Sequence, residues 1–227
     1  MKGFHTSFIY HNREDRAKYI WLKYKTILQG RILDVGADKG YLGSYIPSEC
    51  QYTTVGLMPE HDVHVDLENP LPIDSNAYDC VLCSGVLEHI ENIHQLFDEL
   101  CRVTRKYLII MLPNPWNDFI KVLRKGYYSR NDSMGDYNLP LSPPTDRHRW
   151  FFSSTDAKRF IRAKARENDM RVLQLDQLMS RRRWRIVCKF LCHFFVHRSI
   201  KYEDLAGWQI WGVLEKKPSN SVSDKAD

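Results

Sequence analysis

Short apolar runs alternate with stretches of helical periodicity in the first half of the chain. Four runs have the length and composition of buried strands, at residues 31–35, 51–57, 79–84 and 107–112. A shorter strand is expected within residues 61–67. One helix is predicted before the first strand, at residues 13–28, and others between the strands, from residue 41 and at residues 93–103. This alternation predicts βαβ units and therefore an α/β fold with a doubly wound, mostly parallel sheet.

The second half of the chain leaves this alternation. Residues 114–152 are rich in Pro, Gly, Asn and aromatic residues, so they are expected to form a lid-like insert that is mostly loop. A helix is predicted to begin at Ser153 or Ser154, either of which is a good N-cap. Strands at residues 171–176 and 208–214 are expected to pair antiparallel, which gives the sheet an antiparallel C-terminal edge strand.

Together these elements predict one domain over residues 1–215. Within it, residues 178–205 are expected to form a basic, amphipathic insert between the last two strands. The polar tail at residues 216–227 is expected to be disordered. The composition agrees with this organisation, because 227 residues with 43% hydrophobic and 27% charged side chains are ordinary for one globular domain.

The charge balance and the cysteines narrow the function classes. The 33 basic and 28 acidic residues give a formal net charge of +5, which is too mild for a dedicated nucleic-acid-binding protein. Cys80 and Cys83 fall in a predicted buried strand rather than in a zinc-binding or redox turn, and the six cysteines do not resemble a disulfide framework. The N-terminus lacks the apolar core of a signal peptide, and no apolar stretch reaches the roughly 20 residues of a membrane span. A cytoplasmic protein is therefore expected.

The most informative segment is ILDVGADKGYL at residues 32–42. It predicts a strand that ends near Asp34, a tight turn through Gly36 and a helix that begins near Gly40. Glycine permits a backbone approach that a Cβ atom would block, and the N-terminus of a helix offers free N–H groups to a ligand. Ligands of open α/β sheets bind beyond the carboxyl ends of the strands, where this turn lies. Taken alone, the turn is also compatible with a plain strand-to-helix connection.

Three further segments follow this turn in a recognisable order. The four segments are ILDVGADKGYL (32–42), TTVGLMPE (53–60), VDLENPLPIDSNAYDCVLCSGVLEHI (65–90) and LIIMLPNP (108–115). In order and spacing they resemble the class I S-adenosylmethionine (SAM)-dependent methyltransferases, in the group with an LEH tripeptide after the fourth strand. The resemblance implies a Rossmann-like methyltransferase fold, SAM as the cofactor and an enzyme that transfers its methyl group.

The resemblance also implies which residues bind the cofactor. They are Asp34, Gly36, Ala37 and Gly40 at the methionine end, Met58, Asp66 and Leu67 at the ribose and adenine, and Ser84, Gly85 and Val86 on the floor beneath it. Two positions depart from the family pattern. Asp38 stands where the family has its middle glycine, and Met58 replaces the acidic residue that holds the ribose hydroxyls. Glu60, two residues further on, is the expected substitute for that acid.

The acceptor side is expected in the lid-like insert. A hydroxyl acceptor must lose a proton during methyl transfer, and histidine and carboxylate side chains are the usual bases. Residues 146–149 hold an acid, a histidine and two arginines, so His148 is predicted as the catalytic base, with His89 as the second candidate. The alternative is that the arginines pair with local carboxylates while residues 150–152 pack in the core. The expected acceptor is an oxygen atom of a small molecule, a saccharide or a lipid-linked intermediate.

The basic insert contains RRRWRIVCKFLCHFFVHRSIK at residues 181–201. It is basic at its start, apolar after Trp184 and too short to cross a bilayer. It is expected to pack on its own sheet or in a homodimer, or else to make peripheral contact with a membrane. Nucleic-acid binding is disfavoured because the basic run is short. The insert also holds two cysteines and two histidines, but they fall on adjacent helical faces, so no metal site is predicted.

Two other function classes share the predicted fold. A non-catalytic protein could retain the methyltransferase fold to bind a partner, and the residues at positions 38 and 58 keep this reading open. A nicotinamide-dependent oxidoreductase would need an acidic residue at the position of Met58. Its short-chain type would also need a Tyr-x-x-x-Lys pair after the fifth strand, and the sequence has none.

Overall fold

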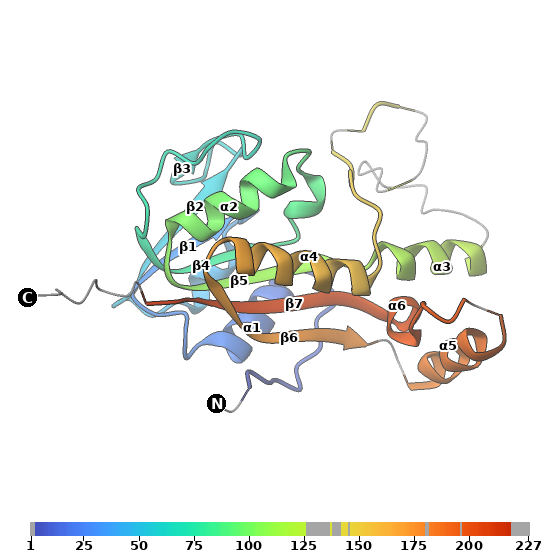
Figure 1. Cartoon of the computed structure of the whole chain (residues 1–227). Helices are drawn as coiled ribbons and strands as arrows, with labels where there is room; N and C mark the ends of the chain where they lie inside the picture. Colours follow the sequence, from blue (N-terminus) through green and yellow to red (C-terminus); the bar gives the residue numbers. More distant parts are fainter. Residues whose placement is uncertain are drawn as a thin grey trace, which may run out of the picture.

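The strands of the chain form one sheet with helices on both faces, as seen in a computed structural model (Figure 1). The described residues are 3–125, 137, 142–144, 146–179, 182–195 and 197–218. The strands are β1 (Arg31–Val35), β2 (Gln51–Gly56), β3 (Val63–His64), β4 (Tyr78–Ser84), β5 (Thr104–Pro113), β6 (Met170–Met179) and β7 (Gly207–Lys216). Over the described residues they lie in the order β3-β2-β1-β4-β5-β7-β6.

Most neighbouring strands in the sheet run parallel. β1 pairs in parallel with β2 and β4, β2 with β3, and β4 with β5. β7 runs antiparallel to both β5 and β6. The prediction of a doubly wound, mostly parallel sheet is therefore confirmed. The antiparallel C-terminal strand β7 lies one place in from the edge, and β6 forms the edge itself.

Helices bury both faces of the central strands. α1 (Arg13–Tyr24) covers one face, while α2 (Ile93–Val103) and α4 (Ser154–Glu167) cover the other (Figure 1). β4 shows the consequence, because Cys80 and Leu82 pack in the core cluster beneath α1, and Val81 and Cys83 pack in the cluster beneath α2. A strand buried on both faces reads as a continuous apolar run, which is why these strands could be predicted.

One helix lies within the region that was expected to be loop. α3 (Pro115–Lys125) occupies the start of residues 114–152, so that expectation was wrong here. Pro115 stands at the first helical position, where its missing N–H costs nothing. Trp116 and Ile120, four residues apart, pack against Leu205 and the rest of a small apolar cluster. Residues 126–136, 138–141 and 145 of the lid-like insert lie outside the described residues.

The C-terminal strands are longer than expected. β6 runs to Met179, so the insert between the strands begins after residue 178 and holds α5 (Arg182–Phe195) and α6 (Tyr202–Ala206). Lys216, expected in a disordered tail, is the last residue of β7. Its Nζ donates hydrogen bonds of 2.9 Å to the carbonyl oxygens of Cys101 and Thr104, which anchors the end of the strand. Residues 219–227 of the tail lie outside the described residues.

None of the helices in the described part of the chain is both long and apolar enough to cross a bilayer.

Asn114 joins β5 to the C-terminal insert. Its buried Nδ2 donates hydrogen bonds to the carbonyl oxygens of Asp204 (2.7 Å) and Gly207 (2.6 Å), and Asn117 donates to that of Leu205 (2.8 Å). These bonds satisfy three carbonyl groups where α6 passes into β7. The Asn-Pro-Trp sequence after the fifth strand therefore has a structural role at the base of α3.

We expect Asn114→Ala to lower the free energy of unfolding by about 3 kcal/mol, because two buried carbonyl groups lose their donors. Urea denaturation followed by circular dichroism measures this difference. The exposed Asn69→Ala is the matched control and should change stability by less than about 0.5 kcal/mol. A loss below about 1 kcal/mol for Asn114→Ala would contradict the anchoring role.

Candidate functional site

A cleft of about 600 Å³ opens beyond the carboxyl ends of β1, β2, β4 and β5. The predicted cofactor-binding residues that line it are Gly36, Met58, Asp66, Leu67, Gly85 and Val86. The remaining four line two adjoining hollows. Asp34, Ala37 and Ser84 line a small one that shares Gly36 with the cleft, and Gly40 lines a larger one that shares Met58. The structure therefore brings all ten residues to one end of the parallel strands.

The turn after β1 needs glycine at its first position. Gly36 has φ +67°, and a Cβ atom placed on it would lie 2.4 Å from Cγ2 of Val86. This close approach joins the turn after β1 to the turn after β4. Gly40 also has a positive φ, +65°, and precedes the short 3-10 helix η1 (Tyr41–Tyr45).

Asp38, at the family's middle glycine position, keeps the backbone conformation that glycine would provide. Its φ is +51°, in the left-handed region that aspartate tolerates better than most residues. Its Oδ1 lies 2.9 Å from Nη1 of Arg13 on α1. The substitution therefore preserves the turn and adds an ion pair at the rim of the cleft.

A buried carboxylate lies beneath the turn. Asp34 is 6% exposed and accepts a 2.6 Å hydrogen bond from the hydroxyl of Tyr52. Burial raises the pKa of Asp34 to about 6, although the Tyr52 hydroxyl and the positive charge of Arg16 act in the opposite direction. Burial disfavours the charged form of Asp34, and a ligand that carries a positive charge would stabilise that form.

Met58 lies at the outer rim rather than in the interior of the site. It is exposed, and it lines both the cleft and the hollow beside η1. Glu60, the expected substitute, lines that hollow but not the cleft. His61, the residue after Glu60, is buried against Gly56 and lines both the cleft and the hollow.

Asp62 fixes this turn to β2. Its Oδ2 accepts hydrogen bonds from the backbone N–H (2.7 Å) and the hydroxyl (2.8 Å) of Thr54. These bonds lower the pKa of Asp62, so its carboxylate stays charged and holds the turn that carries Met58 and Glu60.

The LEH tripeptide forms a second 3-10 helix, η2 (Leu87–His89). Leu87 is fully buried in the core and Glu88 is 3% exposed, while His89 lines the cleft. Nδ1 of His89 lies 2.9 Å from Oδ2 of Asp146, which comes from the lid-like insert. The rings of His89 and His148 meet edge to face with their centroids 4.6 Å apart. The two histidines predicted as candidate bases therefore lie together.

His148 is half-buried between His89 and the rest of the insert. Burial, reinforced by His89, lowers the pKa of His148 to about 4, although Asp146 acts in the opposite direction. The imidazole is therefore neutral at physiological pH.

The end of the insert is fastened to the LEH turn. The backbone N–H of Arg149 donates to the carbonyl oxygen of Glu88 (2.8 Å), and its Nε donates to that of His89 (2.7 Å). The indole N–H of Trp150 donates to the carbonyl oxygen of Ile90 (2.7 Å). Arg149 also lies 3.3 Å from a carboxylate oxygen of Glu91, as the alternative reading of the arginines expected.

The same alternative expected residues 150–152 to pack in the core. That was wrong for Trp150 and Phe151, which are exposed. The indole N–H of Trp150 donates to the LEH turn instead, and the ring of Phe151 contacts that of Phe119 on α3. Phe152 is half-buried and packs against the core cluster beneath α2.

Sequence reasoning missed Arg16, Tyr52 and His61, although all three line the site. Arg16 flanks the apolar face of α1, and Tyr52 lies in a strand pattern that predicts packing. No local signal tells that either side chain reaches Asp34. Their roles follow from the packing of α1 and β2 beside β1, which is a long-range property of the fold.

Comparison with known proteins gives the family. A family model described as a methyltransferase domain matches residues 11–164. No curated protein matches the sequence.

Solved structures share the fold at low identity. A putative SAM-dependent methyltransferase from Listeria monocytogenes is 14% identical, with a TM-score of 0.56 over 89% of this chain and 99% of that chain. The [4+2]-cyclase SpnF is 14% identical, with a TM-score of 0.54 over 94% and 86%. The 1,6-didemethyltoxoflavin-N1-methyltransferase from Burkholderia thailandensis, solved with its acceptor and S-adenosylhomocysteine, is 12% identical, with a TM-score of 0.50 over 91% and 79%.

The turn after β1, the LEH turn after β4 and the strand order agree with the resemblance drawn from the sequence. The family match extends that resemblance over most of the chain. The nicotinamide-dependent and non-catalytic readings are therefore set aside, and the chain belongs to the methyltransferase domain family, as a class I methyltransferase with SAM as its cofactor.

Proposed function

We propose that this enzyme transfers the methyl group of SAM to an oxygen atom of a small-molecule, saccharide or lipid-linked acceptor. The choice of oxygen rests on His89 and Asp146, whose Nδ1 and Oδ2 atoms lie 2.9 Å apart. They line the part of the cleft between the LEH turn and the lid-like insert, which we call the acceptor end. An oxygen acceptor needs a base, and a histidine oriented by a carboxylate is a common one.

The residues at the β1 end of the cleft fit SAM. Gly36 leaves room that a Cβ atom would fill, and Asp34 offers a buried carboxylate to the positively charged methionine end. We assign adenine to Asp66 and Leu67 and the floor to residues 84–86, as the resemblance implies. Glu60 is assigned to the ribose in place of Met58. Bound SAM supplies a methyl group on a positively charged sulfur, which becomes a neutral thioether after transfer, so the acceptor must release one proton.

His89 is the proposed proton acceptor. With Asp146 beside Nδ1, the tautomer that carries its proton on Nδ1 is favoured, which leaves a lone pair on Nε2. His148, whose ring meets that of His89, is proposed to contact the acceptor from the opposite segment. Arg149 and Trp150 hold this segment on the LEH turn, and so they act as positioning residues.

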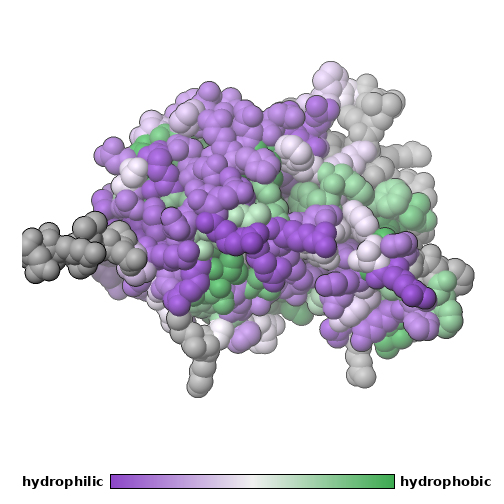
Figure 2. Space-filling model, in the orientation of Figure 1, coloured by the Kyte–Doolittle hydropathy of each residue, from purple (hydrophilic) through white to green (hydrophobic). Residues whose placement is uncertain are grey.

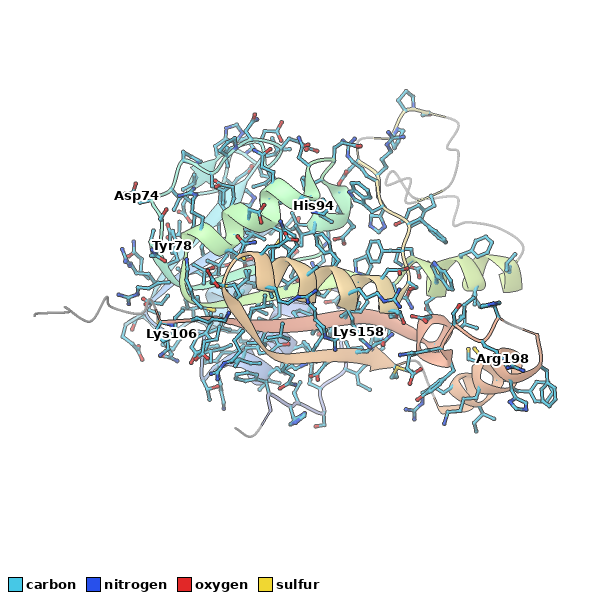
Figure 3. All side chains as sticks on the ribbon, in the orientation of Figure 1. Asp74, Tyr78, His94, Lys106, Lys158 and Arg198 are labelled. Carbon is cyan, nitrogen blue, oxygen red and sulfur yellow. The ribbon has the colours of Figure 1, made fainter. Side chains whose placement is uncertain are left out.

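The exposed face of α5 supports a lipid-linked acceptor. Ile186, Val187, Phe190 and Phe194 are between 44% and 61% exposed, while Cys188 of the same helix is buried. Figure 2 shows apolar residues beside strongly polar ones at the end of the molecule that carries α3 and α5. Arg185 precedes this face, and Arg198 follows it at the same end (Figure 3). We propose that this face lies in an anionic membrane interface, where apolar burial and charge attraction act together.

Arg181 lies outside the described residues, as do the side chains of Arg182 and Arg183. Their charges in the sequence add to the basic character of the start of α5.

Replacing Asp34 should separate stability from cofactor binding. Because the folded protein holds the Asp34 proton more tightly than the unfolded chain, wild-type stability falls as pH rises from about 4 through about 6. Asp34→Asn removes this loss, so the variant should be up to about 3 kcal/mol more stable than wild type at pH 8 and nearly equal at pH 4. Urea denaturation at both pH values measures the difference.

The same variant should bind SAM at least about tenfold more weakly at pH 8, because a charged hydrogen-bond acceptor is lost. Calorimetric titration with SAM, S-adenosylhomocysteine and NAD tests this, and NAD should not bind. Asp74→Asn, at an exposed position (Figure 3), is the control and should change neither property. A variant that is less stable than wild type at pH 8, or that binds SAM equally well, would contradict the role of Asp34.

Replacing His89 should slow methyl transfer and leave the affinity for SAM unchanged. We expect His89→Ala to lower the rate of S-adenosylhomocysteine release about 100-fold or more with a responsive acceptor, and Asp146→Asn to lower it less. Affinity for SAM should stay within about twofold. Hydroxylated acceptors are screened first, as phenols, sugars and polyprenyl-linked saccharides. Full activity of His89→Ala would rule out its role, and activity confined to amine acceptors would rule out oxygen as the target.

Replacing the two aromatic residues of α5 should release the protein from membranes. Sedimentation with vesicles that contain phosphatidylglycerol should show binding of wild type, and Phe190→Ser with Phe194→Ser should weaken it at least about tenfold. Ile9→Ser, at a residue 66% exposed elsewhere, is the control. If wild type is instead a dimer that these substitutions dissociate, with no binding to vesicles, the face is a subunit interface and the membrane proposal fails.

A further inference from the structure

Three potential metal ligands meet at the acceptor end of the cleft. Glu88, His89 and His148 each offer one ligand atom, and these atoms all lie within 4.8 Å of one another. Two come from the LEH turn and one from the lid-like insert, so the group exists only in the folded chain. The sequence predicts no metal site, because ligands so far apart along the chain form no recognisable spacing.

The chemistry of this group points to one class of ion. Two imidazoles and one carboxylate suit divalent first-row transition ions such as Zn²⁺, Fe²⁺ or Co²⁺, whereas Mg²⁺ and Ca²⁺ prefer oxygen ligands. Bonds of about 2.1 Å place tetrahedral ligand atoms roughly 3.4 Å apart. The present spacing of up to 4.8 Å means that the side chains would have to move toward one another on binding an ion.

We propose that Glu88, His89 and His148 bind a divalent first-row transition ion at the acceptor end of the cleft. Three protein ligands leave at least one coordination position open, as in catalytic rather than structural metal sites. All three residues line the cleft, so the open position is available to an acceptor. The inference rests on the proposed function for its purpose, although metal binding itself is independent of it.

The neighbours of the three ligands support this arrangement. Asp146 lies 2.9 Å from Nδ1 of His89, and an outer carboxylate commonly orients a metal-bound histidine. The backbone N–H of Arg149 donates to the carbonyl oxygen of Glu88 (2.8 Å), which ties the two ligand segments together beside the site. Glu88 is 3% exposed, and an ion would place positive charge against its buried carboxylate.

The ion changes how the acceptor loses its proton. An acceptor hydroxyl bound at the open position would have a lower pKa, and its proton would pass to water. The resulting oxygen takes the methyl group as the carbon–sulfur bond breaks, and the electron pair of that bond remains on sulfur. With the ion in place, His89 and His148 would serve as ligands, so His89 would bind the ion instead of accepting the proton, while oxygen would remain the methyl acceptor.

Cobalt binding tests the site without reference to activity. Full-length protein stripped with a chelator is titrated with Co²⁺, followed by visible absorption and calorimetry. We expect one equivalent to bind with the spectrum of nitrogen and oxygen ligands, and Zn²⁺ to displace it. His148→Ala and His89→Ala should each weaken binding at least about tenfold. His94→Ala, on α2 outside the cluster (Figure 3), is the matched control and should bind as wild type does.

Three outcomes would overturn the proposal. They are no stoichiometric binding by wild type, equal binding by a folded His148→Ala protein, and thiolate-to-cobalt absorption that disappears in Cys192→Ser, since Cys192 is only half-buried. Circular dichroism checks the fold of each variant, and the wild-type spectrum tests the site even if a variant is unfolded. A SAM titration of the same samples separates the two proposals. SAM binding without cobalt binding sinks only the metal site, and cobalt binding without SAM binding sinks only the proposed function.

Discussion

The approach of Gly36 to Val86 is the contact on which the site depends. Parallel strands deliver their carboxyl ends to one edge of the sheet, but β1 and β4 carry different turns there. The missing Cβ of Gly36 lets the two turns touch, with Val86 2.4 Å from where that atom would be. One turn follows Asp34 at the end of β1 and leads to η1, and the other leads directly into the LEH helix. The spacing between the two turns at this edge of the sheet therefore depends on one glycine and the valine it meets.

The insert after β5 is joined to the LEH turn by hydrogen bonds to backbone carbonyl oxygens, in addition to the packing of Phe152 on the core. The carbonyl oxygens of the LEH turn receive donors from Arg149 and Trp150, while Phe151 remains exposed. Carbonyl groups at the end of a short 3-10 helix lack partners within the helix, so they are available to another segment. This explains how His148 can reach His89 although the chain between β5 and α4 is long. It also explains why the aromatic residues beside His148 do not behave as core.

Local patterns predicted the sheet because its central strands are buried on both faces. Continuous apolar runs are short and unmistakable at β4 and β5, and the turn at Gly36 follows from its glycine. α3 escaped prediction because its apolar residues pack in one cluster with α5 and α6, which come about 70 and about 90 residues later in the chain. Arg16 and Tyr52 escaped for the same reason, since only the pairing of β1 with β2 and the packing of α1 bring them to Asp34. His89 and His148 could be chosen by residue type, but their contact could not.

Asp34 and Asp38 show how differently two acids in one turn can be accommodated. Asp38 occupies a backbone conformation that glycine would adopt more easily, and it gains an ion pair with Arg13 near solvent. Asp34 is buried, and its raised pKa means that keeping it charged opposes folding at neutral pH. Packing alone would favour an uncharged residue there, with Tyr52 still able to donate its hydrogen bond. A charge that the fold holds against its own stability supports the proposed role of Asp34, because the methionine end of SAM carries a positive charge.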